Sequence, residues 1–180
     1  FFSFFFCASS VYITNDLLDL ESDRRHPKKC KRPFAAGDLP ITQGIFASIV
    51  LFISGLKMAL YVNPSFLMIL LVYYGLTTLY SFKLKRIALI DCLLLATLYT
   101  TRIIAGGVAT DTPLTFWLLA SAFFLFYSLA LIKRFAELKL LRHKGMNKTQ
   151  GRDYHLDDES LIHGLGIGSG LGAVIIFALY

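Results

Sequence analysis

Charged residues are missing from long stretches of this 180-residue chain, and cysteine is scarce throughout it. The three cysteines are an odd number and widely scattered, which excludes a small domain held together by disulfides. A hydrophobic share of 56% excludes intrinsic disorder, because disordered chains are poor in apolar residues. The same share argues against reading the net charge of +6 as a nucleic-acid-binding surface, so we expect no nucleic acid partner.

Six apolar segments carry few charges or none. A helix needs roughly 20 mostly apolar residues to cross a bilayer, and all the segments but the first are near that length. The first has no basic flank and no small-residue cleavage site, unlike a signal peptide. The pattern predicts an all-α integral membrane protein, a multi-helix transmembrane bundle forming a single domain over 1–180. The segments are 1–14, 41–62, 65–82, 87–110, 113–132 and 161–180.

Basic residues gather on alternate connections between these segments. All but two of the 18 Lys and Arg residues lie in 15–40, 83–86 and 133–152, and the other two connections hold none. By the positive-inside rule, we expect these three loops in the cytoplasm and the chain in the cell inner membrane.

Acidic side chains follow the first apolar segment at helical spacing. Asn15, Asp19 and Asp23 are four residues apart, and Asp16 precedes Asp19 by three. If the first helix continues past the membrane surface, all four lie on one stripe. Such a cluster is unfavourable without a cation, and hard carboxylate oxygens suit Mg²⁺ completed by substrate phosphates. A solvated loop whose bases only anchor the topology is the alternative.

The same residues carry a resemblance to a known family. Residues 15–23 resemble the N-D-x-x-D-x-x-x-D signature of the UbiA superfamily of intramembrane prenyltransferases, and 24–37 are similar to its extension in the polyprenyl-phosphate phosphoribosyltransferase branch. Residues 80–86 resemble a Tyr-x-x-x-Lys-type element of the family. The resemblance implies roughly nine membrane helices. The six segments would be the second to the seventh, so we expect a fragment that lacks both ends.

The resemblance also implies a mechanism and a set of site residues. It implies a transferase in which Mg²⁺, held by Asn15, Asp16, Asp19 and Asp23, bridges to a (di)phosphate and pyrophosphate leaves. Its partners would be a polyprenyl phosphate or diphosphate lipid in the membrane and a soluble diphosphate donor or small acceptor. Expected catalytic residues are Asp16, Asp19, Tyr80 and Lys83. Expected phosphate-binding residues are Arg24, His26, Lys28, Lys29, Arg32, Lys85, Arg86, Arg102, Lys133 and Arg134.

The loop that matches the family's second aspartate motif departs from it. It opens Lys133-Arg134-Phe135-Ala136-Glu137, with one acid behind two bases, as in the phosphoribosyltransferase-like branch. Asp153 and Asp157 have the motif's spacing in different surroundings. The departure favours phosphoribosyl transfer from phosphoribosyl diphosphate to polyprenyl phosphate over prenyl transfer to an aromatic or other acceptor.

Two other membrane functions are open alternatives. A transporter would place its charges at a midplane cavity rather than at one rim. A transferase of the CDP-alcohol type would carry Gly and Ala-Arg between its aspartates, where this chain has Leu20-Glu21 after Asp19.

Some polar features fall within the predicted spans. Asp91 and Arg102 are functional candidates because ionisable residues at membrane depth are costly. Arg102 would hold a lipid phosphate or pair structurally, and Lys57 could snorkel to the surface. The glycines of 164–172 lack the strand that a nucleotide-binding loop needs, and they predict close helix packing instead.

Overall fold

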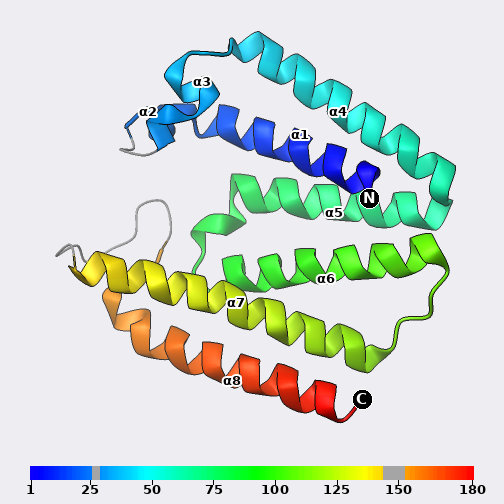
Figure 1. Cartoon of the computed structure of the whole chain (residues 1–180). Coiled ribbons are helices and arrows are strands. Elements are labelled where there is room, and N and C mark those ends of the chain that lie inside the picture. The colour runs from blue at the N-terminus through cyan, green and yellow to red at the C-terminus, as the bar shows by residue number, and fades with distance from the viewer. Residues whose placement is uncertain (26–28, 144–152) are drawn as a thin grey trace. The chain divides into compact units, whose positions relative to one another are not determined.

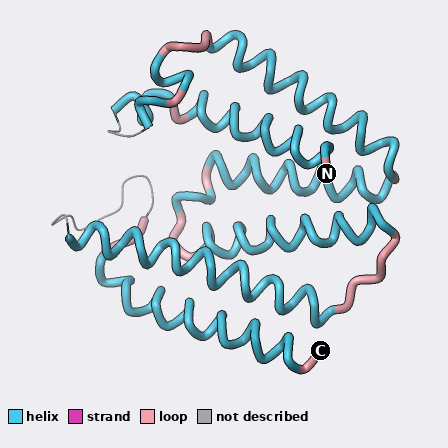
Figure 2. The backbone as a smooth tube through the Cα atoms, in the orientation of Figure 1, coloured by secondary structure: helices cyan, strands magenta, loops and turns pink. Residues whose placement is uncertain are grey.

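A computed structural model describes residues 1–25, 29–143 and 153–180, and its regular elements are all helices (Figures 1 and 2). The chain divides into two compact units, 1–78 and 79–180, each of which has its own packed helices. The helices are α1 (Phe2–Leu18), α2 (Leu20–Arg25), α3 (Pro33–Ala36), α4 (Ile41–Val62), α5 (Pro64–Phe82), α6 (Ile90–Thr110), α7 (Phe116–His143) and α8 (Glu159–Ala178), with 3₁₀ turns η1 (Lys29–Lys31), η2 (Leu84–Arg86) and η3 (Leu156–Asp158).

Five helices of the described part are long and apolar enough to cross a membrane. They are α4 to α8, and the bounds of α4, α5, α6 and α8 lie within three residues of the predicted segments. The first segment forms α1, which at 17 residues is shorter than a span requires. The predicted all-α membrane fold class is confirmed.

Helix α7 is longer than the sequence pattern indicated. Its 28 residues continue to His143, well past the expected end of the span at Ile132. The first bases of the last basic connection therefore project from a helix rather than from a loop. Arg134 and Glu137 fall three residues apart on that helix, a spacing at which opposite charges meet.

The expectation of one unbroken helix through the acidic motif is wrong. Helix α1 ends at Leu18 and α2 begins at Leu20, and Asp19 between them has φ −90° and ψ 8°. The chain still turns helically there, because the N–H of Asp19 donates to the Asn15 carbonyl at 2.9 Å and the N–H of Asp23 to the Asp19 carbonyl at 2.8 Å.

In the first unit, α1 packs antiparallel against α4 (Figure 1). Glycine makes the approach close, since a Cβ on Gly55 would lie 2.7 Å from Cys7 Sγ. Midway along the pair, the hydroxyls of Ser10 and Ser48 hydrogen-bond at 3.1 Å. These contacts hold the end of α1, where the acidic motif begins, against α4.

In the second unit, α7 packs against both α6 and α8 (Figure 1). The Ser128 hydroxyl donates to the Gly166 carbonyl at 2.8 Å, and a Cβ on Gly170 would lie 3.1 Å from Ser128 Oγ. The predicted packing role is thus confirmed for these two glycines. It does not extend to Gly164 and Gly168, where an added Cβ would meet nothing within 4 Å.

Candidate functional site

The acidic motif at the end of α1 is held together by an arginine from the following turn. Nη1 of Arg32 donates to Oδ1 of Asp16 at 2.8 Å and to Oδ2 of Asp23 at 2.7 Å. One nitrogen can bind both oxygens only if they lie within about 5.5 Å of each other, the sum of the two distances. Asp16 and Asp23 are seven residues apart, a rise of about 10.5 Å in a straight helix, and one arginine nitrogen reaches both carboxylates.

Asp23 is the buried member of this pair. Its side chain is 2% exposed, against 29% for Asp16. Its second oxygen, Oδ1, makes no hydrogen bond with any described residue, and the Lys29 ammonium lies 3.8 Å from it. A buried carboxylate oxygen without a hydrogen bond is costly, which makes this position receptive to a cation.

Of the four predicted metal ligands, the structure joins Asp16 and Asp23 through Arg32, and the four-ligand set stays a prediction. Within the described ranges, no group of three or more His, Cys, Asp or Glu side chains is close enough to hold a metal ion. Asn15 and Asp19 are half-buried nearby in sequence and are engaged in interactions of their own. The donor chemistry fits Mg²⁺, because the joined groups are hard carboxylate oxygens and one of them lacks a hydrogen bond.

The other predicted phosphate-binding residues of the first unit surround this pair in sequence. Arg24 is exposed on α2, and Lys29 is 48% exposed in η1. His26 and Lys28 lie outside the described residues.

In the second unit, the predicted basic residues cluster around η2. Lys83 precedes this turn and is exposed, Lys85 is half-buried and Arg86 is exposed, while Tyr80 is half-buried near the end of α5. The carbonyl of Arg86 accepts a hydrogen bond at 3.0 Å from the N–H of Asp153. The basic turn is therefore tied to the segment that leads into α8.

A buried charge network lies beside this turn. Nε of Arg134 donates to Oδ2 of Asp91 at 2.7 Å, and Nη1 of Arg134 donates to Oε2 of Glu137 at 2.7 Å. The hydroxyl of Tyr154 donates to Oδ1 of Asp91. Asp91 is fully buried and Arg134 is 2% exposed, so Arg134 has two carboxylates as partners at the position where phosphate binding was expected.

Tyr154 links the network to the start of α6. Its phenol oxygen accepts a hydrogen bond at 2.8 Å from the N–H of Leu89, whose φ is +64°. A leucine rarely adopts positive φ, so this bond helps to hold a strained turn. Burial, and then the hydrogen bond to Asp91, raise the pKa of Tyr154 well above its ordinary value of 10.0.

Two predicted residues on the helices of this unit are exposed. Lys133 lies on α7, one residue before Arg134. Arg102 lies midway along α6 with its guanidinium carbon 5.4 Å from the centre of the Tyr99 ring, a cation–π contact.

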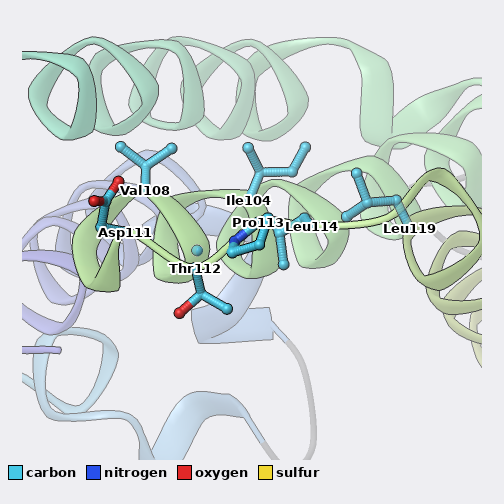
Figure 3. Close-up of a pocket in the computed structure, with 8 residues that line it drawn as sticks. Ile104, Val108, Asp111, Thr112, Pro113, Leu114 and Leu119 are labelled. Atoms are coloured by element: carbon cyan, nitrogen blue, oxygen red, sulfur yellow. The ribbon is translucent and has the colours of Figure 1, made fainter.

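A separate pocket lies at the other end of α6 from Asp91. Its lining comes from the end of α6, the turn 111–115 and the start of α7 (Figure 3). None of its lining residues is basic, so its chemistry does not suit a phosphate. The lining residues are Ile104, Gly107, Val108, Asp111, Thr112, Pro113, Leu114 and Leu119.

Sequence reasoning singled out Asp91 but missed Tyr154, to which Asp91 is bound. The two residues are 63 positions apart, and a lone tyrosine in a polar loop carries no distinctive pattern. The only signal in the sequence was indirect. A carboxylate inside an apolar segment requires hydrogen-bond donors, and a tyrosine hydroxyl is one of the few donors that can be buried in apolar surroundings.

These features define a class: an all-helical membrane protein with clustered aspartates after its first helix and basic residues between its spans. Residues 1–147 match the UbiA prenyltransferase family, and the chain belongs to that family. Family membership and the five apolar helices together make it an integral membrane protein.

Several curated proteins are similar to this chain. The nodulation protein NoeC of Azorhizobium caulinodans is 37% identical over 180 residues, which are the whole of this chain and 59% of NoeC. The decaprenyl-phosphate phosphoribosyltransferase of Mycobacterium tuberculosis is 37% identical over 145 residues, 81% of this chain and 48% of that enzyme. The enzyme of that name from Corynebacterium glutamicum is 35% identical over 147 residues. The chain spans 35% to 59% of the length of its curated relatives.

Proposed function

We propose that the intact protein is a Mg²⁺-dependent membrane transferase acting on a polyprenyl phosphate. The reaction would move the phosphoribosyl group of phosphoribosyl diphosphate to the lipid phosphate and release pyrophosphate. An oxygen of the lipid phosphate forms a bond to the anomeric carbon of the ribose, while the bond from that carbon to the diphosphate oxygen breaks. The electron pair of the broken bond leaves with pyrophosphate.

The choice of donor depends most on the contacts of Arg134. Glu137, the acid behind the two bases in the region of the family's second aspartate motif, is bound by Arg134, which also binds Asp91 of α6. Glu137 is thus part of a buried ion-pair network, and we propose the acidic motif of residues 15–23, where Asp23 is buried with one oxygen lacking a hydrogen bond among the described residues, as the place for a cation. This arrangement suits a donor that needs one metal site and basic residues. The similarity to decaprenyl-phosphate phosphoribosyltransferases over 81% of the chain supports the same choice.

The leaving pyrophosphate carries several negative charges that the protein must neutralise. Mg²⁺ held by Asp16 and Asp23, with Asn15 and Asp19 beside them, would supply positive charge to the diphosphate oxygens. In the second unit, considered by itself, Lys83, Lys85, Arg86 and Lys133 would bind phosphate oxygens by charge-assisted hydrogen bonds. The alternation of basic loops supports a cytoplasmic position for these residues and an inner-membrane location for the protein.

A two-substrate assay of the purified intact protein tests the proposal. One reaction receives phosphoribosyl diphosphate and a polyprenyl phosphate with Mg²⁺, and the other receives a polyprenyl diphosphate and aromatic acceptors. We expect pyrophosphate release and a phosphoribosylated lipid in the first reaction only. Release in the second reaction alone would reject phosphoribosyl transfer and favour prenyl transfer. Cation flux across liposomes without turnover of either donor would favour a transporter.

A further inference from the structure

One nitrogen atom of Arg32 lies where a bridging cation would lie. Nη1 is 2.8 Å from Oδ1 of Asp16 and 2.7 Å from Oδ2 of Asp23, so it neutralises both carboxylates at once. A divalent cation bound to the same two oxygens would need the space that Nη1 fills. Arg32 and the cation therefore compete for one position.

The two carboxylates are held more firmly than the arginine that bridges them. Asp23 is 2% exposed, whereas the Arg32 side chain is 37% exposed. A part-exposed guanidinium can rotate toward solvent at little cost, but a buried carboxylate cannot be left without a positive partner. The second oxygen of Asp23 already lacks a hydrogen bond among the described residues, so Asp23 gains further from a divalent cation.

A guanidinium that leaves the carboxylates has an obvious alternative partner. Its planar fork of donors matches a phosphate group, which it can bind through two parallel hydrogen bonds. Arg32 would meet such a group if the cation that displaced it also carried a diphosphate, as the proposed function requires.

We propose that Arg32 is an exchange residue that couples cation binding to diphosphate binding. Arg32 bridges Asp16 and Asp23 until a divalent cation takes their oxygens, and then it turns to the diphosphate. The inference rests on the proposed function. It predicts that the cation alone binds weakly, because Arg32 must be displaced, and that diphosphate tightens cation binding by giving Arg32 a new partner. By linkage, the cation must tighten diphosphate binding by the same factor.

Direct binding measurements on the intact protein in detergent test the exchange. Mn²⁺ serves as the spectroscopic probe, and free Mn²⁺ is followed by electron paramagnetic resonance with and without inorganic pyrophosphate. A protein-free titration corrects for the Mn²⁺–pyrophosphate complex in solution. For Arg32→Gln we expect Mn²⁺ alone to bind roughly two- to tenfold tighter than in the wild type, the range expected for losing a part-exposed ionic competitor. The tightening by pyrophosphate should be lost.

Two variants make the result specific to Arg32. Arg25→Gln removes the same charge from an exposed position on α2 and should leave both effects at wild-type values. Arg32→Lys keeps a positive charge without the fork, so it should restore competition with Mn²⁺ and only part of the coupling. Thermal unfolding in the same detergent checks that each variant is folded.

The outcomes separate this inference from the proposed function. If Arg32 only stabilised the structure, Arg32→Gln would weaken Mn²⁺ binding. Weaker binding or an unchanged Mn²⁺ affinity in this variant overturns the proposal that Arg32 is an exchange residue. The transferase proposal would stand after either result, provided that the wild type turns over phosphoribosyl diphosphate. A wild type that binds no Mn²⁺, or that binds it equally after Asp16→Asn and Asp23→Asn, overturns the exchange and the proposed metal site together. If Arg32→Gln unfolds, Arg32→Lys provides the test. If Arg32→Lys competes with Mn²⁺ as the wild type does and shows the full tightening by pyrophosphate, the guanidinium fork has no role in the exchange.

Discussion

Arg134 and Asp91 form a buried ion pair, with Nε of Arg134 2.7 Å from Oδ2 of Asp91. The residues lie 43 positions apart, on α7 and α6, and the pair connects the two helices next to the basic turn η2. Its burial decides its energetic role, because removing one member leaves an uncompensated charge inside the protein.

The first prediction concerns this pair. Asp91→Ala should destabilise the protein by about 3–5 kcal/mol, the usual cost of breaking a buried pair from one side. Asp157→Ala, at an exposed aspartate of η3, should change the free energy of unfolding by less than about 0.5 kcal/mol. Chemical unfolding in detergent measures both. Adding Arg134→Leu to Asp91→Ala should recover part of the loss. Equal stability of the two single variants would contradict the assigned role of the pair.

The second prediction concerns Tyr154 and pH. Its folded-state pKa is raised above 10.0, so its stabilising contribution is fully present below about pH 10 and is lost as the pH rises above that value. Tyr154→Phe leaves Leu89 N–H and Asp91 each short of a hydrogen bond and should cost about 1–3 kcal/mol at pH 7. The difference in unfolding free energy between wild type and variant should shrink above pH 10. Tyr180→Phe, at an exposed tyrosine, is the control. A difference that grew with pH would contradict the prediction.

The third prediction tests the close packing of α1 on α4. Gly55→Ala would put a methyl group 2.7 Å from Cys7 Sγ and 3.0 Å from the Ser3 carbonyl, and it should destabilise by about 1–3 kcal/mol. Gly75→Ala is the matched control in α5, where an added Cβ meets nothing within 4 Å. Since alanine favours helix more than glycine does, that variant should be neutral or more stable by up to about 1 kcal/mol. Thermal melts in one detergent compare them, and equal losses would argue against the packing explanation.

The fourth prediction concerns the acidic motif and activity. Asp16→Ala and Asp19→Ala in the intact protein should abolish pyrophosphate release while membrane insertion persists, because each removes an expected metal ligand. Asp38→Ala removes an exposed carboxylate from the same connection and should retain activity. Radiolabelled donor turnover is the measurement, and membrane fractionation shows insertion. Full activity in both motif variants would refute a catalytic role for these aspartates.

Much of the fold was predictable because it depends on local composition. Apolar length alone located α4, for which the predicted and observed ranges are both 41–62. The end of α7 was not predictable from hydropathy. The apolar pattern of a membrane span ends at the first charged residue. A helix instead continues for as long as its backbone hydrogen bonds continue, and α7 extends to His143.

The acidic motif shows where the sequence stopped being sufficient for the site. Its spacing grouped Asp16 with Asp23, which Arg32 bridges in the structure, but it assumed a straight helix, and the four-ligand set stays a prediction. The structure interrupts the helix at Asp19 and joins two carboxylates through Arg32, nine residues beyond Asp23. That contact depends on how the chain folds back through η1, which no periodicity encodes.

The sequence by itself determined the spans, the grouping of basic residues and the family signature, because hydrophobicity, charge and motif spacing are properties of neighbouring residues. Only the tertiary structure decided which acidic and basic side chains form ion pairs with one another. The position of Arg134 in the sequence predicts a phosphate ligand, and the structure adds that Arg134 is buried with Asp91 and Glu137 as partners. The physical reason is that electrostatic energy depends on distance and burial, and both are set when helices pack.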